Sequence, residues 1–244
     1  MSGIGWLVRG LISFVIRLLR LIRVNPRESV SSIWAIVPVK PLRRAKSRLA
    51  RALKAEQRAA LARSLFARTL DVLSSVERIA GVVVVTSDLT VQDIARAKHA
   101  VPLAETDAGL NAAIAQACEW IGNRQATAAL IIPTDLPLLA ASDLEALIDL
   151  AYEPACIVIA PDRRDEGTNA LLLRPAQVMQ PAFGVSSFET HCARAAQHGI
   201  PRRIYRSATI GLDLDAPADL ERCNELKEVM QISGQASDDA EQIG

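Results

Sequence analysis

The sequence predicts an α/β domain whose mostly parallel, Rossmann-like sheet carries helices on both faces. Short apolar runs rich in β-branched residues alternate along the chain with segments of helical periodicity, the order expected of parallel strands joined by helices. The runs are apolar without interruption, which is typical of strands that are buried on both faces. The 244 residues, 50% of them hydrophobic, suffice for one such core without disulfides or structural metals.

The first half of the body supplies three of these runs. Residues 33–39, I-W-A-I-V-P-V, predict the first buried strand. After a basic stretch, apolar residues recur at three- and four-residue spacing from Ala62 to Val76, which predicts a helix. Gly81 opens the second strand, V-V-V-V, which ends in the polar residues T-S-D. The elements predicted next are a helix at 90–98, a strand at 101–104, a helix at 110–122 and a strand at 129–135.

The second half continues the alternation. Ser142-Asp-Leu-Glu145 reads as a capping box that begins a helix, and Pro217 lies near the start of the last helix. The elements predicted between them are strands at 156–161 and 169–173, a helix at 187–199 and a strand at 203–206. Sheets of this kind bind ligands beyond the carboxyl ends of their strands, so functional residues are expected in the loops there.

Residues 1–31 are predicted to be a basic amphipathic extension and linker before a domain at 32–231, with a polar, disordered tail at 232–244. Within 6–23, one helical face gathers Arg9, Ser13, Arg17, Arg20 and Arg23. The arginines interrupt the run too often for a transmembrane span, and no clear signal-peptide cleavage site follows. Peripheral contact with an anionic membrane is one interpretation. Docking on the body, self-association and a wrongly chosen start codon are the alternatives.

Charge and composition narrow the class of protein. The net charge is +1, divided into +4 for residues 1–31 and −3 for the rest, which is not the electrostatic footprint of a nucleic-acid-binding protein. The four cysteines are widely spaced, so reduced, packed thiols in the cytosol are expected rather than a metal site or disulfides. His191 and His198 fall in a predicted helix and are expected to be ordinary surface or boundary residues.

A cluster of Lys and Arg follows the first strand, in P-V-K-P-L-R-R-A-K-S-R-L at 38–49. A triphosphate needs such cations to offset its charge and that of its leaving group. The segment is neither a Walker loop nor a G-x-G-x-x-G turn. A solvated basic turn would have the same composition, so the cluster alone does not establish a nucleotide site.

Carboxylates stand at two further strand ends: Asp135 in P-T-D-L-P, and Asp213 and Asp215 in G-L-D-L-D-A-P. Oxygen ligands at the open edge of an α/β sheet suit Mg²⁺, which binds a few carboxylates together with substrate phosphates. Alternation places Asp213 and Asp215 on one face and the intervening leucines on the other. We predict Asp135 and Asp213 as metal ligands, while Asp215 is either a third ligand or the cap of the last helix.

A third group lies between the predicted strands and the helix at 187–199. Thr168 and Asn169 follow Gly167 at the start of a strand, and Gly184 precedes Ser187 before a helix. A helix N-terminus preceded by Gly and Ser is a site for an anion. An ordinary N-cap accounts for one serine equally well.

Taken together, these segments resemble the guanylyltransferases of coenzyme F-420 biosynthesis, which act on 2-phospholactate, phosphoenolpyruvate or 3-phosphoglycerate. The resemblance runs from about Trp34 to Leu220. The motifs that carry it, in chain order, are W-A-I-V-P-V-K-P-L-x-x-A-K-S-R-L, V-V-V-V-T-S-D, G-L-N-A-A, P-x-D-L-P-L-L, A-P-D-R, G-T-N-A-L-L-L-R-P, F-G-x-x-S-F and L-D-x-D-x-P-x-D-L. It implies a nucleotidyltransferase-type sheet and a cytoplasmic enzyme that takes GTP, a phosphorylated three-carbon acid and Mg²⁺.

The resemblance also implies roles for individual residues. The acid is expected at Thr168, Gly184 and Ser187, with Asn169 beside them. The triphosphate is expected at Lys40, Lys46 and Arg48, and the nucleobase at Gly109, Leu110 and Asn111. Lys46, Arg48 and Asp135 are the predicted catalytic residues. A relative with another nucleotide or acceptor, and a non-catalytic membrane-associated scaffold, are the alternatives. The preferred acid and the oligomeric state are not predicted.

Overall fold

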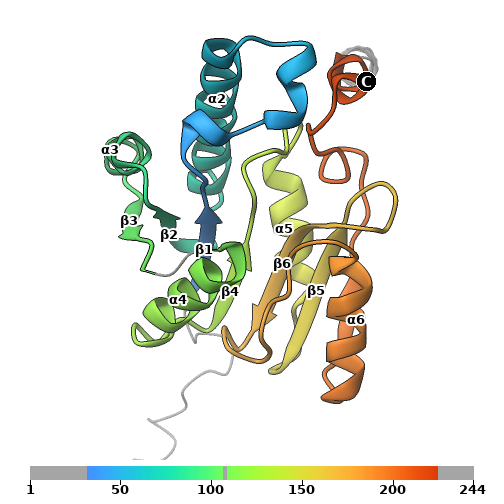
Figure 1. Cartoon of the computed structure of the whole chain (residues 1–244). Helices are drawn as coiled ribbons and strands as arrows, with labels where there is room; N and C mark the ends of the chain where they lie inside the picture. The colour runs from blue at the N-terminus through green and yellow to red at the C-terminus, as the bar shows by residue number, and fades with distance from the viewer. Residues whose placement is uncertain (1–31, 107–108, 225–244) are drawn as a thin grey trace, which may run out of the picture. The chain divides into compact units, whose positions relative to one another are not determined.

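The computed structural model describes residues 32–106 and 109–224, so the predicted extension at 1–31 and the tail at 232–244 lie outside the described residues. The described residues form a seven-stranded sheet in the order β3-β2-β1-β4-β6-β5-β7 (Figure 1). The strands are β1 (Ile33–Pro38), β2 (Ile79–Thr86), β3 (Val101–Ala104), β4 (Ala128–Ile131), β5 (Cys156–Pro161), β6 (Thr168–Arg174) and β7 (Arg202–Ile204). The predicted α/β class is confirmed.

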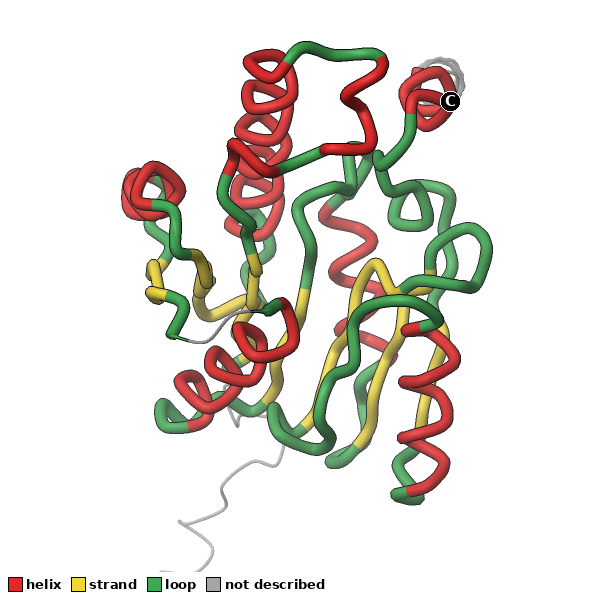
Figure 2. The backbone as a smooth tube through the Cα atoms, in the orientation of Figure 1, coloured by secondary structure: helices red, strands yellow, loops and turns green. Residues whose placement is uncertain are grey.

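Strand β6 runs against the rest of the sheet. It pairs antiparallel with both β4 and β5, whereas the other neighbouring pairs are parallel. The carboxyl ends of β1, β4 and β5 therefore share one edge with the amino end of β6. Figure 2 shows the loops of that edge gathered at one end of the sheet. Thr168, the first residue of β6, thereby lies on the same edge as the loops that follow the parallel strands.

Helices cover both faces of the sheet, as predicted. They are α2 (Ala55–Ser74), α3 (Leu89–Ala97), α4 (Leu110–Gly122), α5 (Ala141–Leu150) and α6 (Ser187–Gln197). One buried cluster joins α2, α3 and α5 to alternate strand residues such as Val84 and Leu130. A second joins α4 and α6 to the residues between them, such as Val83 and Ile131 (Figure 1). Each fully buried Leu or Ile in these clusters contributes about 1.5–3 kcal/mol.

Several predicted boundaries are wrong. The basic segment forms two 3₁₀ turns, η1 (Leu42–Arg44) and η2 (Ser47–Arg51), and α2 begins at Ala55, about two turns before the apolar pattern that predicted it. The fourth strand ends at Ile131 because Pro133 has no N–H for a strand ladder. Residues 212–215 are not a strand. Their leucines are nevertheless buried and their aspartates half-exposed, so the predicted alternation is confirmed.

The predicted capping box at the start of α5 is out of register. The helix begins at Ala141, and the Asp143 carboxylate accepts a hydrogen bond from the Ala140 N–H at 3.0 Å. Ser142 therefore lies inside the first turn instead of capping it. Asp143 prevails because its buried carboxylate also accepts hydrogen bonds from Tyr205, Ser207 and Thr209.

Among the described residues, no helix is both long enough and apolar enough to cross a membrane.

Candidate active site

The basic loop after β1 points one cation into a group of carboxylates. The Lys46 ammonium lies 3.3 Å from the Asp135 carboxylate and 3.5 Å from that of Asp215, and its side chain is only 8% exposed. Arg48, whose side chain is 76% exposed, reaches the other Asp215 oxygen at 3.1 Å. Lys46 has a φ of 55°, a left-handed conformation that costs a lysine free energy and is typical of functional loops. The predicted catalytic residues Lys46, Arg48 and Asp135 therefore lie together.

The carboxylates come from two segments joined through the backbone. Asp135 follows β4, and its carbonyl oxygen accepts the Leu214 N–H at 2.9 Å. Leu212 and Leu214 are each 2% exposed, so Asp213 and Asp215 lie on the opposite side of the segment. Burial, followed by the nearby charge of Asp135, raises the pKa of the Asp213 carboxyl. The edge therefore concentrates negative charge in a partly dehydrated setting.

Asp215 does not cap the last helix. Its carboxylate pairs with Lys46 and Arg48, whereas the Asp219 carboxylate accepts the N–H groups of Asp215 at 3.0 Å and Ala216 at 2.6 Å. Asp219 also pairs with Arg163 at 2.9 Å. The helical residues that begin at 217 are thus capped by Asp219, which leaves the Asp215 carboxylate directed at the basic loop.

The same carboxylates are the candidate ligands of a metal ion. Within the part of the chain that the structure describes, no group of three Asp, Glu, His or Cys side chains is arranged to hold an ion. Lys46 instead lies between Asp135 and Asp215. The donor chemistry nevertheless fits Mg²⁺: these are hard carboxylate oxygens at one edge, and their mutual repulsion contributes to the raised pKa of Asp213.

Three predicted triphosphate and nucleobase contacts make no ion pair with this group among the described residues. Lys40 is exposed, and the described residues offer its side chain no ion pair. Gly109 is exposed with a φ of 119°, and it stands immediately before the N-terminus of α4. Leu110 is half-buried and packs with the core under α4. The first two are open to solvent, and the start of α4 offers free N–H groups.

The predicted acid-binding residues gather around a buried histidine. Thr168 is 7% exposed, and its hydroxyl lies 3.0 Å from Nδ1 of His191. The Ala182 N–H donates to Nε2 of the same ring at 2.9 Å. The expectation that His191 is a surface or boundary residue is wrong, because the ring is fully buried. His198, the residue directly after α6, is exposed as expected.

The segment between Ala182 and α6 brings Gly184 and Ser187 close together. Ser187 is the first residue of α6 and is 2% exposed, and its N–H donates to the Gly184 carbonyl at 3.2 Å. Gly184 has a φ of 139°, which side chains rarely allow, and a Cβ added there would have nothing within 4 Å. Backbone conformation rather than lack of space therefore requires glycine at this turn.

Two of the predicted contact residues hydrogen-bond to the backbone of other segments and so hold the site together. The Asn169 amide donates to the Ile210 carbonyl at 2.9 Å, which joins β6 to the segment before Asp213. The Asn111 side chain makes two hydrogen bonds with the backbone of Phe183, at 2.8 and 2.9 Å. Asn111 thus fastens the start of α4 to the turn that leads into Gly184.

Sequence reasoning missed several residues that shape these loops. Asp88, after β2, accepts the Leu42 N–H at 3.0 Å and so anchors the basic loop. Asp162, after β5, accepts three backbone N–H groups between residues 164 and 167. Both aspartates are in motifs quoted above, directly after a strand, which is the signal that could have identified them.

The cysteines are not among the charged groups of this edge, although Cys223 packs with Leu138 and Leu212 next to it. All four are free, as predicted, and three of them are buried. Burial raises the pKa of the Cys118 thiol to about 12, so this side chain remains a neutral, packed thiol.

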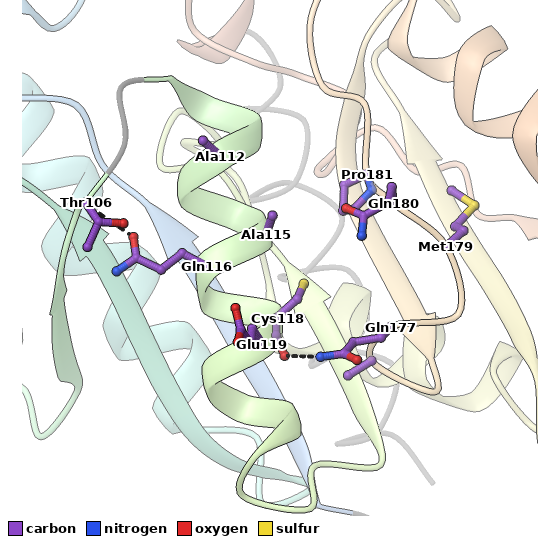
Figure 3. Close-up of a pocket in the computed structure, with 11 residues that line it drawn as sticks. Thr106, Ala112, Ala115, Gln116, Cys118, Glu119, Gln177, Met179, Gln180 and Pro181 are labelled. Carbon is purple, nitrogen blue, oxygen red and sulfur yellow. Dashed lines mark hydrogen bonds between the residues drawn. The ribbon is translucent and has the colours of Figure 1, made fainter.

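A separate cavity of about 710 Å³ lies between α4 and the segment after β6 (Figure 3). The figure shows Ala115 and Cys118 on the helix and Gln177, Gln180 and Pro181 on the segment across from it. None of the described residues that line it is Lys or Arg. This cavity therefore lacks the charge that a triphosphate requires, and the chemistry of the molecule concentrates at the sheet edge instead.

Several solved structures share this fold. One is 4-diphosphocytidyl-2C-methyl-D-erythritol synthase from Anaerococcus prevotii, with a TM-score of 0.58 and 10% identity over 82% of this chain and 97% of that one. Another is CMP:2-keto-3-deoxy-manno-octonic acid synthetase in complex with CTP, with a TM-score of 0.57 and 15% identity over 82% and 100%. The likeness confirms the predicted nucleotidyltransferase type of sheet.

Relatives found by sequence have a higher identity to this chain than these solved structures do. A phosphoenolpyruvate guanylyltransferase of Sphaerobacter thermophilus is 38% identical over 77% of this chain and 90% of its own, and one of Rubrobacter xylanophilus is 39% identical over 78% and 93%. A 3-phospho-D-glycerate guanylyltransferase of Colwellia psychrerythraea is 33% identical over 76% and 88%. The family described as "Guanylyl transferase CofC like" matches residues 33–231. The chain belongs to this family of CofC-like guanylyl transferases.

Proposed function

We propose that the protein transfers GMP from GTP to a small phosphorylated three-carbon acid and releases pyrophosphate, as a step of coenzyme F-420 biosynthesis. The observation that carries the proposal is the meeting of three groups at one sheet edge. These are the cationic loop with Lys46, the carboxylates around Asp135, and the buried hydroxyl side chains of Thr168 and Ser187 at the starts of β6 and α6. A guanylyl transferase needs a place for a triphosphate, for counter-charge and for a second anion, and this edge offers all three.

The reaction needs no general base. A phosphate oxygen of the acid is already ionised near neutral pH, so it can attack the α-phosphorus of GTP directly. The new P–O bond forms as the bond to the β-phosphate oxygen breaks, and pyrophosphate carries away the electron pair. The protein therefore contributes by holding two anions in line and by stabilising charge on the leaving group. Lys46 and Arg48 are the cations best placed for the second task.

Asp135 and Asp213 would hold Mg²⁺, which when bound would neutralise phosphate charge. Lys46 then has two roles. In the structure its ammonium balances Asp135 and Asp215, and with substrate present the same ammonium is free to turn toward the phosphates. Asp215 lies with the two proposed ligands and pairs with both basic side chains.

The N-terminus of α4 supports a nucleobase position at Gly109 and Leu110. Gly109 is exposed and leaves room beside the helix start, while Leu110 offers an apolar surface. Asn111 is held beside them by its two hydrogen bonds to the backbone of Phe183, and its exposed amide keeps one N–H and one lone pair for a base.

Phosphoenolpyruvate is the first acceptor to test, because the relatives from Sphaerobacter and Rubrobacter are named for it. The Colwellia relative makes 3-phosphoglycerate the second, and 2-phospholactate completes the set. The nucleotide needs its own comparison, since the solved structures of the same fold include one in complex with CTP.

The test is pyrophosphate release by the full-length protein with Mg²⁺, with each of the three acids paired with GTP, CTP, ATP and UTP. The expected result is release that requires GTP and one of the acids, with formation of the guanylylated acid confirmed by mass spectrometry. Release with another nucleotide would replace guanylyl transfer by a different nucleotidyl transfer. Silence with every pair would contradict the proposed reaction.

A further inference from the structure

One buried imidazole joins the segments that carry the proposed acid pocket. His191 lies on α6, one turn after Ser187, and its ring is fully buried. Through Nδ1 it contacts Thr168 at the start of β6, and through Nε2 it holds the backbone of Ala182. The Phe183 ring packs edge-on against it, with ring centroids 5.2 Å apart. A single side chain thus fixes a strand, a helix and a turn relative to one another.

The two hydrogen bonds determine which ring nitrogen carries the proton. The Ala182 backbone N–H can only donate, so Nε2 must present its lone pair. In the neutral ring the proton therefore sits on Nδ1, which donates to the Thr168 hydroxyl oxygen at 3.0 Å. That oxygen then acts as an acceptor, and the threonine's own proton is left for another partner. The described residues provide no second hydrogen bond to this hydroxyl.

The neutral form of the ring is secure near neutral pH. Burial, and to a smaller extent the charge of Arg194, lower the pKa of His191 to about 4. The Arg194 guanidinium is itself engaged, donating to the Gln180 carbonyl at 2.8 Å. The arrangement of donors and acceptors therefore does not change over the pH range in which phosphate acids are dianionic.

We propose that His191 is a positioning residue for the acceptor, which fixes Thr168 as a hydrogen-bond donor to an anionic oxygen of the acid while it holds the turn before Gly184. The inference rests on the proposed function and adds a residue to its acid pocket. A hydroxyl whose oxygen already accepts one hydrogen bond still has its own proton to donate. Phosphate and carboxylate oxygens are strong acceptors for such a donor.

Matched variants separate the two bonds of the ring. In His191→Gln the longer amide can place its oxygen near the former Nε2, which keeps an acceptor for Ala182 but removes the donor to Thr168. In His191→Asn the shorter amide can keep the donor near the former Nδ1 and loses the bond to Ala182. His198→Asn, at the exposed residue that follows the last turn of α6, is the control.

The expected result for His191→Gln is a rise of about tenfold in KM for the acid, with KM for GTP and the melting temperature little changed. His191→Asn should raise KM for the acid less. Because His191 acts through the hydroxyl, adding His191→Gln to Thr168→Val should cost no more than Thr168→Val alone. Parallel rises in both KM values, or additive effects in the double variant, would overturn the proposal in favour of a purely structural role.

A second readout does not depend on turnover. Nitrogen-15 spectra of the full-length protein at pH 7 should show a protonated Nδ1 and an unprotonated Nε2 for His191, and the reverse assignment would overturn the inference. Addition of phosphoenolpyruvate should shift the Nδ1 resonance in wild type but not in Thr168→Val. If pyrophosphate release fails but this shift is seen, the reaction is wrong and the acid pocket stands. A wild-type resonance that ignores all three acids would overturn the inference itself.

Discussion

At the scale of single residues, the sheet edge that carries the candidate active site (the active edge) brings several carboxylates together. The nearby cations of the folded protein do not neutralise all of them. Asp135, Asp213 and Asp215 lie near one another, and Lys46 contacts only the first and the last of them. Repulsion between these carboxylates lowers the free energy of unfolding of the protein, and binding of a cation relieves it. Single substitutions in this group should therefore separate stability from activity.

Asp135→Asn should lower kcat roughly 100-fold or more while leaving the melting temperature unchanged or slightly higher. Activity falls because a proposed metal ligand is lost. Stability holds because the lost pair with Lys46 is offset by relief of the repulsion with Asp213, and Lys46 keeps Asp215 as its partner. The measurements are steady-state pyrophosphate release and thermal unfolding. Asp149→Asn, which removes a 71% exposed carboxylate on α5, is the control and should keep full activity. Near-normal turnover of Asp135→Asn would remove this residue from the mechanism.

The pH dependence of stability should report the buried imidazole. The pKa of His191 in the folded protein is about 4, below its ordinary value of 6.5. As pH falls from 6.5 to 4, the unfolded chain takes up a proton that the folded chain refuses, so stability is full above this window and lost within it. The effect is on the order of 3 kcal/mol.

Urea unfolding at pH 7, 5.5 and 4.5 measures this effect directly. Wild type should lose stability relative to His191→Gln as pH falls, because glutamine does not titrate. A difference between the two proteins that stays constant with pH would contradict the burial of a neutral ring.

At the scale of elements, side chains of one segment hold the backbone of the next. Asp88 ties the basic loop to the start of α3, since it accepts the N–H groups of both Leu42 and Thr90. Asp143 on α5 gathers the hydroxyls of Tyr205, Ser207 and Thr209 before the chain reaches Asp213. Side chains at the starts of α3 and α5 therefore hold the loops of the active edge in place through hydrogen bonds.

The packing of α4 depends on a glycine in β2. Gly81 lies beside Trp34 of the paired strand, and a Cβ there would come within 2.7 Å of the indole ring. Trp34 in turn meets Trp120 of α4 edge-on, with ring centroids 5.4 Å apart. The absence of a side chain at Gly81 thus allows an aromatic contact that locates the helix.

Gly81→Ala should destabilise the protein by about 1–3 kcal/mol, because the displaced Trp34 ring cannot keep its contact with Trp120. Near-ultraviolet circular dichroism should report the altered tryptophan pair, and urea unfolding should give the loss of stability. Gly122→Ala is the matched control, because its Cβ would meet the movable amide end of Gln177. Equal stability of the two variants would show that Trp34 is not held by Gly81.

At the scale of the whole molecule, the sequence predicted the layers well and the contacts poorly. Apolar periodicity identified the strands and helices because burial on a sheet face leaves a local pattern. The direction of β6 left no such pattern, since a buried strand reads alike in either direction. The site depends on still longer separations: Lys46 and Asp215 are 169 positions apart, and Asn111 and Phe183 are 72. His191 was misjudged because its partners, Thr168 and Ala182, are met only in the folded chain.

Removal of residues 1–31 should leave guanylyl transfer intact and the melting temperature within about 2 °C of that of the full chain. The reason is that β1 begins at Ile33, the family match begins at residue 33, and the Ser32 carbonyl that accepts the Thr127 N–H would be retained. Activity and thermal unfolding of the two chains are the measurements. Loss of folding on truncation would show that the domain extends into this segment.

The same two chains test the membrane interpretation of residues 6–23. Flotation with vesicles rich in anionic lipid should carry the full chain and not the truncated one if the basic helical face binds lipid. Equal behaviour of the two chains would end that interpretation.

The reversed strand also imposes an order on synthesis and folding. β6 follows β5 in sequence but sits between β4 and β5 in the sheet, so β4 gains its second neighbour only after both later strands have been made. Until β6, which ends at Arg174, has been synthesised, the backbone N–H and C=O groups of β4 that face away from β1 have no strand to pair with. An open, apolar strand edge recruits strands from other chains. A chain that ends between β4 and β6 is therefore expected to aggregate more readily than the full-length chain.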